Sequence, residues 1–210
     1  MPVAWGELTR QRQFDEPLVT TRRSKTANRN DDAIAILMQD HKRVQRLFRA
    51  FEDLDRNDPD ACREILELAC TELKVHAALE EEIFYPAVRK VFGESDAALL
   101  NEAEIEHDTA KRLIARLEGM QPDDAYYAPT FTVLGEYVKH HVKQEESAML
   151  PKVKKAKLDL GELRARMRTR KRELTEGSGT PGQAEPSSEA EGADEPSASR
   201  ALRQARRGKR

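Results

Sequence analysis

The chain contains one motif twice: residues 76–81 read HAALEE and residues 141–146 read HVKQEE. In each copy a glutamate follows four residues after the histidine, and a proline, Pro86 or Pro151, follows ten residues after it. In an α-helix a residue four positions on is displaced by about 6 Å of rise and about 40° of rotation. The histidine and the glutamate of each copy therefore share one face of a predicted helix.

The repetition extends to the segments that precede the two motifs. Asp40-His41 corresponds to Glu106-His107, and the histidine-to-histidine separations within the two copies are 35 and 34 residues. A repeat of this length indicates a duplicated structural unit, here a helical hairpin. Two hairpins with short connections pack as an up-down antiparallel four-helix bundle. We therefore predict an all-α fold built from a duplicated helical hairpin.

Apolar residues at helical spacing, with turn residues between them, set the limits of the predicted helices. Ser95 is placed to cap the third helix, and Pro86 predicts a kink near residues 82–86 of the second. The four predicted helices span about 32–55, 59–92, 95–118 and 129–151.

Composition divides the chain into a core region and its flanks. Hydrophobic residues make up 38% of the 210 residues, and nearly all Leu, Ile, Val and Phe lie between about 31 and 158. The flanks are too polar to bury a core of their own. The predicted organisation is a disordered basic arm at 1–30, the bundle domain at 31–157, a basic helical extension at 158–176 and a disordered low-complexity tail at 177–210.

Four histidines and the two motif glutamates are predicted to face the bundle interior, because each lies on or beside an apolar stripe. An unpaired carboxylate costs several kcal/mol to bury unless a cation or a proton neutralises it. Mixed imidazole and carboxylate donors suit iron or manganese better than a structural zinc site. We predict a paired metal site with the ligands His41, His76, Glu80, His107, His141 and Glu145.

The order His, His-x-x-x-Glu, His, His-x-x-x-Glu resembles the hemerythrin-like, or HHE cation-binding, family over residues 31–157. The resemblance implies a non-haem di-iron centre with an oxo or hydroxo bridge, and it favours iron over manganese or zinc. Two octahedral metals need about twelve ligand positions. Four histidines, two bridging carboxylates and one bridging oxygen fill about ten of them, so about two stay open for a small ligand. The implied terminal ligands are His41, His76, His107 and His141, and the implied bridges are Glu80 and Glu145.

One feature departs from the oxygen-carrying hemerythrins, which have a second histidine on the third helix and an aspartate bridge on the fourth. Ala103 and Lys111 stand one turn either side of His107, and the fourth-helix carboxylate is Glu145. The resemblance therefore implies a protein that binds, senses or reduces oxygen, peroxide or nitric oxide rather than a simple oxygen carrier. Peroxide breakdown is one such activity, and the sequence leaves enzymatic turnover open.

Five further side chains lie near the predicted ligands. Glu81 and Glu146 are expected to contact ligands or solvent rather than metal, and His140 is expected on the surface. Glu104, one turn before His107, is a candidate replacement for the absent histidine. Tyr137 is expected to fill the core near the metals, the alternative being a hydrogen bond to a metal-bound oxygen.

Basic residues gather in 152–172 and 200–210, and two interpretations are open. A solvated helix and tail is one, and a weak contact with nucleic acid or another acidic partner is the other. The second would make the chain an iron- or redox-responsive regulatory module. Cys62 and Cys70 are predicted free thiols, and the sequence has no signal peptide or membrane span, so a cytoplasmic location is expected.

Overall fold

The computed structural model describes residues 32–54 and 58–177, and the described part of the chain has helices and no strand. The all-α prediction is confirmed. The arm predicted at 1–30 and all of the predicted tail except Gly177 lie outside the described residues. The helices are α1 (Ala33–Glu52), α2 (Pro59–Leu79), η1 (Glu80–Phe84), α3 (Tyr85–Arg89), α4 (Glu94–Glu118), α5 (Tyr127–Gln144), η2 (Glu145–Met149), α6 (Leu150–Lys155) and α7 (Leu160–Gly177), of which η1 and η2 are π-helical.

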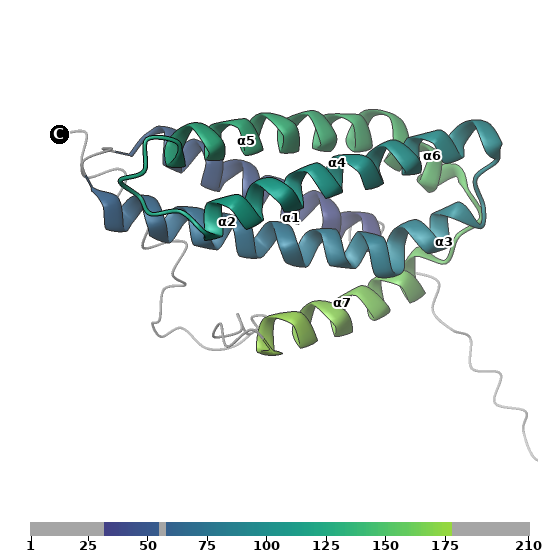
Figure 1. The fold of residues 1–210 in the computed structure, drawn as a ribbon. Coiled ribbons are helices and arrows are strands. Elements are labelled where there is room, and N and C mark those ends of the chain that lie inside the picture. The colour runs from purple at the N-terminus through teal and green to yellow at the C-terminus, as the bar shows by residue number, and fades with distance from the viewer. Residues whose placement is uncertain (1–31, 55–57, 178–210) are drawn as a thin grey trace, which may run out of the picture.

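The helices form four long rods and a fifth helix beside them (Figure 1). The rods are α1, then α2 with η1 and α3, then α4, then α5 with η2 and α6, and successive rods run in alternating directions. Helix α7 packs against α1, α2 and η1. Its buried Leu163 and Met167 explain this contact, because four residues of helix separate them and place both on one face. The sequence predicted a helical extension at 158–176, but not that this helix packs against the bundle.

Aspartate side chains cap the first and second rods, whereas the third and fourth rods have no side-chain cap. Asp32 and Asp58 each accept a hydrogen bond from the backbone N–H three residues on, at 3.0 Å in both cases. The prediction that Ser95 caps the third rod is wrong, because α4 begins at Glu94 after the extended Gly93 and has no side-chain cap. Glu94 and Asp96 in the first turn complement the positive end of the helix dipole instead.

A π-helical turn stands where the proline was expected to kink the second rod, and the fourth rod has a matching one. Pro86 and Pro151 each lie second in the helix that follows η1 or η2. Proline removes a backbone N–H and crowds the preceding turn. The helix accommodates the proline by forming a wider, π-helical turn. The N–H of Tyr85 donates to the carbonyl of Glu80, and the N–H of Leu150 donates to the carbonyl of Glu145, five residues back in each case.

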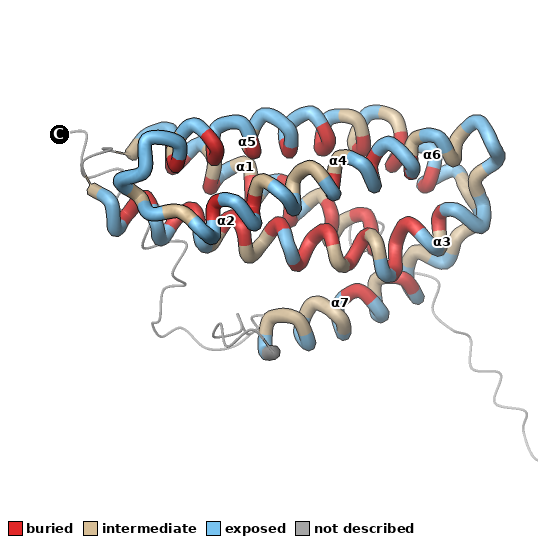
Figure 2. The backbone as a smooth tube through the Cα atoms, viewed as in Figure 1, coloured by how far each residue is buried: buried red, intermediate tan, exposed pale blue. Residues whose placement is uncertain are grey.

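Two apolar clusters fill the bundle, and a polar layer separates them. One cluster runs from Val44 and Leu73 toward Phe51, and the other contains Leu37, Leu79 and residues of α7. On each rod, one histidine lies between the residues of the two clusters: His41, His76, His107 or His141. Figure 2 shows the buried positions of every rod turned toward the bundle axis, so the polar layer is enclosed on all sides by helix.

Candidate metal centre

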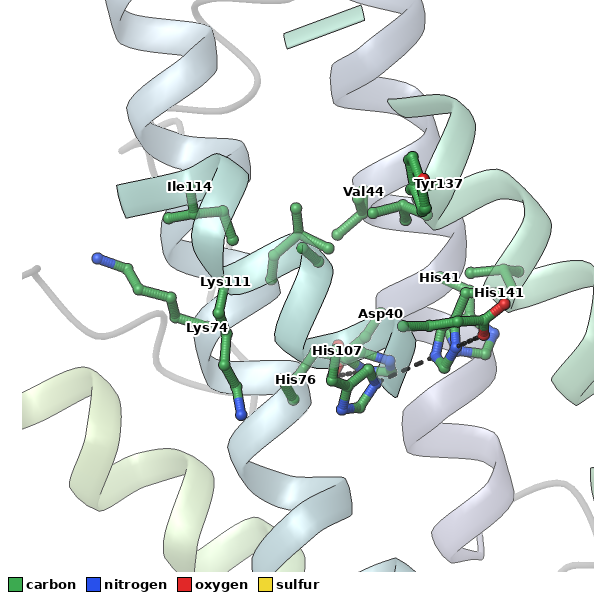
Figure 3. A pocket seen from close by; sticks show the side chains of 16 residues that line it. Asp40, His41, Val44, Lys74, His76, His107, Lys111, Ile114, Tyr137 and His141 are labelled. Atoms are coloured by element: carbon green, nitrogen blue, oxygen red, sulfur yellow. Dashed lines mark hydrogen bonds and ion pairs between the residues drawn. The ribbon is translucent and has the colours of Figure 1, made fainter. Parts of the chain in front are cut away.

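Six predicted donors meet in this polar layer. Each of the four rods contributes a histidine, and the two glutamates are the first residues of the π-helical turns. In Figure 3 the four histidines gather at one end of a cavity. All six side chains are buried, with at most 6% of any residue exposed: His41, His76, Glu80, His107, His141 and Glu145.

The donor atoms form two groups that share Glu80. The first group is His41, His76, Glu80 and Glu145, and the second is Glu80, His107 and His141, with the atoms of each group within 4.8 Å of one another. Glu80 Oε2 lies 3.2 Å from Nε2 of both His76 and His107. Glu145 Oε2 lies 3.2 Å from His41 Nε2 and 3.6 Å from His141 Nε2. Both glutamates therefore reach both halves, which we name the His41/His76 subsite and the His107/His141 subsite.

Every histidine of the site is backed by a carboxylate on its Nδ1 side, which leaves Nε2 directed at the centre. Such partners fix the ring orientation and raise the basicity of a metal-bound imidazole. The pairs are His41 with Glu146 at 2.9 Å, His107 with Glu81 at 2.8 Å, His141 with Glu106 at 2.9 Å and His76 with Asp40 at 3.9 Å. The expectation that Glu81 and Glu146 contact ligands agrees with this geometry.

Sequence reasoning missed the roles of Asp40 and Glu106. The signal was present, because the two residues occupy matching positions in the repeat, each directly before a predicted ligand. Each backs the histidine of the other helix in its own hairpin: Asp40 faces His76, and Glu106 faces His141.

Unpaired buried atoms at the centre fit a bound cation. Within the described residues, His41 Nε2, His76 Nε2, Glu80 Oε1 and Glu145 Oε2 are buried and have no hydrogen-bond partner. Buried polar atoms are normally satisfied, and leaving one unsatisfied costs about 1–3 kcal/mol. Nitrogen and oxygen atoms left free in this way, and directed at one point, are the donors that a divalent metal takes.

In the metal-free protein, protons on the histidines balance the negative charge of Glu80. Burial would raise the pKa of Glu80, but the charge of His76 and hydrogen bonds from His107 and His141 hold it well below the usual range. Burial would lower the pKa of His141, yet the hydrogen bond with Glu106 and the charges of the glutamates raise it to about 10. A metal must therefore displace protons from the histidines.

We expect the stability of the metal-free protein to fall as the pH rises through about 10. The pKa of His141 is raised from 6.5 to about 10, so its protonated form stabilises the fold fully below about pH 6.5 and that contribution is lost as the pH approaches and passes 10. Urea denaturation at pH 7 and pH 10 measures the difference, and His141→Gln should reduce it. A free energy of unfolding that is equal or larger at pH 10 would contradict this expectation.

Tyr85 is a site residue that sequence reasoning did not find. Its buried hydroxyl donates to Glu145 Oε1 at 2.9 Å and lies 3.3 Å from Glu80 Oε2 and 3.5 Å from His107 Nε2. The π-helical turn stacks Tyr85 over Glu80, five residues back. Because Leu150 occupies the equivalent position of the second copy, a hydroxyl is present on only one side of the pair. That difference between the copies was the available signal.

Three other expectations can be checked against the structure. Glu104 is not at the centre: it is half exposed and accepts a hydrogen bond from Arg89 at 2.7 Å, because its position on α4 is rotated outward toward α3. Tyr137 does not fill the core, since it is exposed on α5 at the edge of the cavity. His140 is on the surface, as predicted, and its Nε2 lies 3.5 Å from Glu106.

The third rod supplies no second imidazole. Ala103 is buried in the apolar cluster, and the Lys111 ammonium donates to Glu81 Oε2 at 2.6 Å at the protein surface. The positions on either side of His107 therefore hold a methyl group and an outward-facing cation.

A small apolar cavity adjoins the histidines. It has a volume of about 40 Å³, lies inside the bundle, and includes His41, His76, His107 and His141 in its wall. The rest of its wall is largely aliphatic: Val44, Leu73, Ala77, Ala110, Ile114, Val138 and Val142. A cavity needs about 10–15 Å³ to hold one water, so this one has room for a small ligand with two or three non-hydrogen atoms. Lys74, Lys111 and Tyr137 lie at its solvent edge (Figure 3).

The fold and this site are those of a metal-binding helical protein, and comparison with known proteins gives the family. The hemerythrin HHE cation binding domain matches residues 32–153, so the chain belongs to the hemerythrin HHE family. The matched segment ends before α7.

Two relatives bear on the fold and on the length. A crystal structure of a hemerythrin HHE cation binding domain-containing protein, the Rv2633c homolog from Mycobacterium kansasii, is similar with a TM-score of 0.59 and 21% identity, covering 70% of this chain and 89% of that one. A protein named DNA nickase from Nostoc sp. is 30% identical over 119 residues, which are 57% of this chain. The chain covers only 32% of that relative's length. Among the described helices, none is long and apolar enough to cross a membrane.

Proposed function

We propose that this protein is a non-haem di-iron protein that binds, senses or reduces a small oxidant. The observation that carries the proposal is the set of six buried donors, which fall into two groups that share Glu80, with Glu145 lying 3.2 Å from His41 and 3.6 Å from His141. His41 and His76 would hold one ion, His107 and His141 the other, and Glu80 and Glu145 both. When bound, a pair of irons supplies electrons and Lewis acidity to a ligand in the adjacent cavity.

Iron is the proposed metal because the donor set is nitrogen and oxygen without sulfur. Cys62 and Cys70 form no disulfide and are buried in the apolar cluster that lies to one side of the histidines. Burial raises the pKa of the Cys70 thiol to about 12, so it stays protonated. A closed structural zinc site favours thiolates, whereas imidazole with carboxylate favours iron or manganese with open positions.

The cavity favours a small uncharged ligand. Its volume of about 40 Å³ and its largely aliphatic lining suit oxygen, nitric oxide or hydrogen peroxide better than a larger substrate. The third rod supplies only one histidine, so more ligand positions on the metals would stay open than in an oxygen-carrying hemerythrin. Open positions support reaction with an oxidant or sensing of it. We also propose a cytoplasmic location, which two cysteines without a disulfide favour.

Tyr85 is the proposed hydrogen-bond and proton donor of the site. Its hydroxyl already donates to Glu145 at 2.9 Å, and burial together with the charges of Glu80 and Glu145 raises its pKa well above the usual range. The phenol therefore stays protonated beside the bridging carboxylates. Tyr85 is not among the residues that line the cavity, so it would donate to a ligand at the metals from the side of the two glutamates, without first taking up a proton.

We expect Tyr85→Phe to keep the metals and to slow the reaction with peroxide at least tenfold. The variant loses a positioned donor but no metal ligand, and general acids contribute factors of about 10² or more. Stopped-flow spectra of the iron-loaded protein mixed with oxygen, nitric oxide or peroxide measure the rates. Tyr137→Phe, which removes an exposed hydroxyl at the cavity edge, is the matched control. Unaltered spectra of the wild-type protein with all three oxidants would contradict the proposed function.

A regulatory module that contacts nucleic acid is the second candidate. The exposed Arg166 and Arg172 of α7 and the exposed lysines of α6 favour it, and so does the similarity to a protein named DNA nickase. Binding of duplex DNA that weakens steeply between about 50 and 200 mM salt, and that changes when iron is removed, would support this candidate. Equal and negligible binding with and without iron would contradict it.

A further inference from the structure

Helix α7 lies outside the matched family segment but reaches the metal centre. Leu163 and Met167 seat it on the bundle, and Arg170 fixes it with two hydrogen bonds to Glu82, at 2.7 and 3.1 Å. The next residue, Lys171, is partly buried and donates from Nζ to Asp40 Oδ1 at 2.5 Å. Asp40 is only 3% exposed, so a cation from α7 enters the layer that surrounds the histidines.

The Asp40 pair is the exception among the four carboxylates behind the histidines. Three lie 2.8–2.9 Å from their imidazoles, whereas Asp40 Oδ2 lies 3.9 Å from His76 Nδ1 and has no hydrogen-bond partner. Aspartate is one methylene shorter than Glu106, its counterpart in the repeat. The shorter side chain leaves its other oxygen to Lys171, which competes with His76 for the same carboxylate.

A second lysine shows what the contact with Lys171 adds. Lys111 donates to Glu81, but it is 45% exposed, and Glu81 keeps its 2.8 Å contact with His107. Solvent screens a cation at that position. Lys171 is 25% exposed, and its partner Asp40 does not reach the imidazole that it faces.

We infer that Lys171 is a positioning residue of the metal centre: by holding Asp40 it weakens the support of His76 and makes the His41/His76 subsite the weaker of two unequal metal positions. The physical reason is that a carboxylate that accepts from the Nδ1 of a ligand histidine makes the imidazole a better donor. The ammonium of Lys171 draws the charge of Asp40 away from His76. The two halves of the repeat, alike in their donors, thereby differ in affinity.

This inference rests on the proposed two-metal centre, and anaerobic titration of the full-length protein with Fe²⁺ tests it. Wild type should take up two ions in steps of different affinity. In Lys171→Ala the weaker step should tighten about tenfold, since Asp40 is then released to His76, and the stronger step should not change. Lys171→Arg should behave as wild type. Arg170→Ala is the matched control, because it loosens α7 but keeps the contact with Asp40.

Mössbauer spectra of the ⁵⁷Fe-loaded proteins report the environment of each iron, which would not change if Lys171 only held α7 in place. Two distinguishable iron environments are expected in wild type and Arg170→Ala, and more similar ones in Lys171→Ala. If Lys171→Ala and Arg170→Ala weaken binding alike, or neither changes the weaker step, the inference is overturned and the two-metal centre stands. Wild-type protein that takes up no iron would contradict both.

Discussion

His141→Ala is expected to lower bound iron from about two ions per chain to one or fewer, whereas His140→Ala should leave it unchanged. His141 and His107 are the only imidazoles of their subsite, and the loss of one leaves a single nitrogen donor beside the shared carboxylates. The neighbouring His140 is exposed, and its Nε2 lies 3.5 Å from Glu106 rather than among the buried donors. Metal analysis after purification from iron-replete cells measures the effect.

The adjacent pair makes this comparison sharp, because the two variants differ by one position and remove the same group. Circular dichroism of both proteins checks that the helices persist. Equal iron in His141→Ala and wild type would mean that the buried cluster is not the metal site. A loss of iron in His140→Ala alone would place metal at the surface.

Removal of the metal is expected to lower the free energy of unfolding by several kcal/mol. Glu80 is fully buried, and without a cation its charge depends on protonated histidines. A ligand present at a thousand times its dissociation constant stabilises the folded state by about 4 kcal/mol. Thermal denaturation before and after chelation measures the change, and added iron should restore it. Identical transitions with and without metal would count against a centre that joins all four rods.

The fold was readable from the sequence to the extent that its determinants are local. The His-x-x-x-Glu spacing places two donors on one helical face, and the repeat doubles it, so the six donors and the four long rods could be predicted from residues 32–153 alone. Asp32 and Asp58 act as caps because capping needs only the next three residues.

The misses share a different physical cause. Tyr85 reaches Glu80 because a π-helical turn resets which residues share a face, and ordinary helical spacing does not include that turn. Lys171 meets Asp40 across 131 positions of sequence, which no local pattern encodes. Glu104 and Tyr137 were judged by spacing from a ligand, but the neighbours of α4 and α5 decide which of those positions are enclosed.

The repeat is also informative where its copies differ. Asp40 against Glu106 and Tyr85 against Leu150 are the two substitutions that touch the centre unequally. Both concern groups around the metal positions rather than the donors themselves. If the site holds two metals as proposed, these two differences give the metal positions unequal surroundings.

Metal analysis of purified wild-type protein, with its absorption spectrum before and after peroxide, tests the central claim most directly. We expect about two irons per chain and an absorption band between the ultraviolet and the visible that peroxide alters. Protein from iron-replete cells that carries no iron, or that carries zinc alone and shows no change with peroxide, would contradict the account.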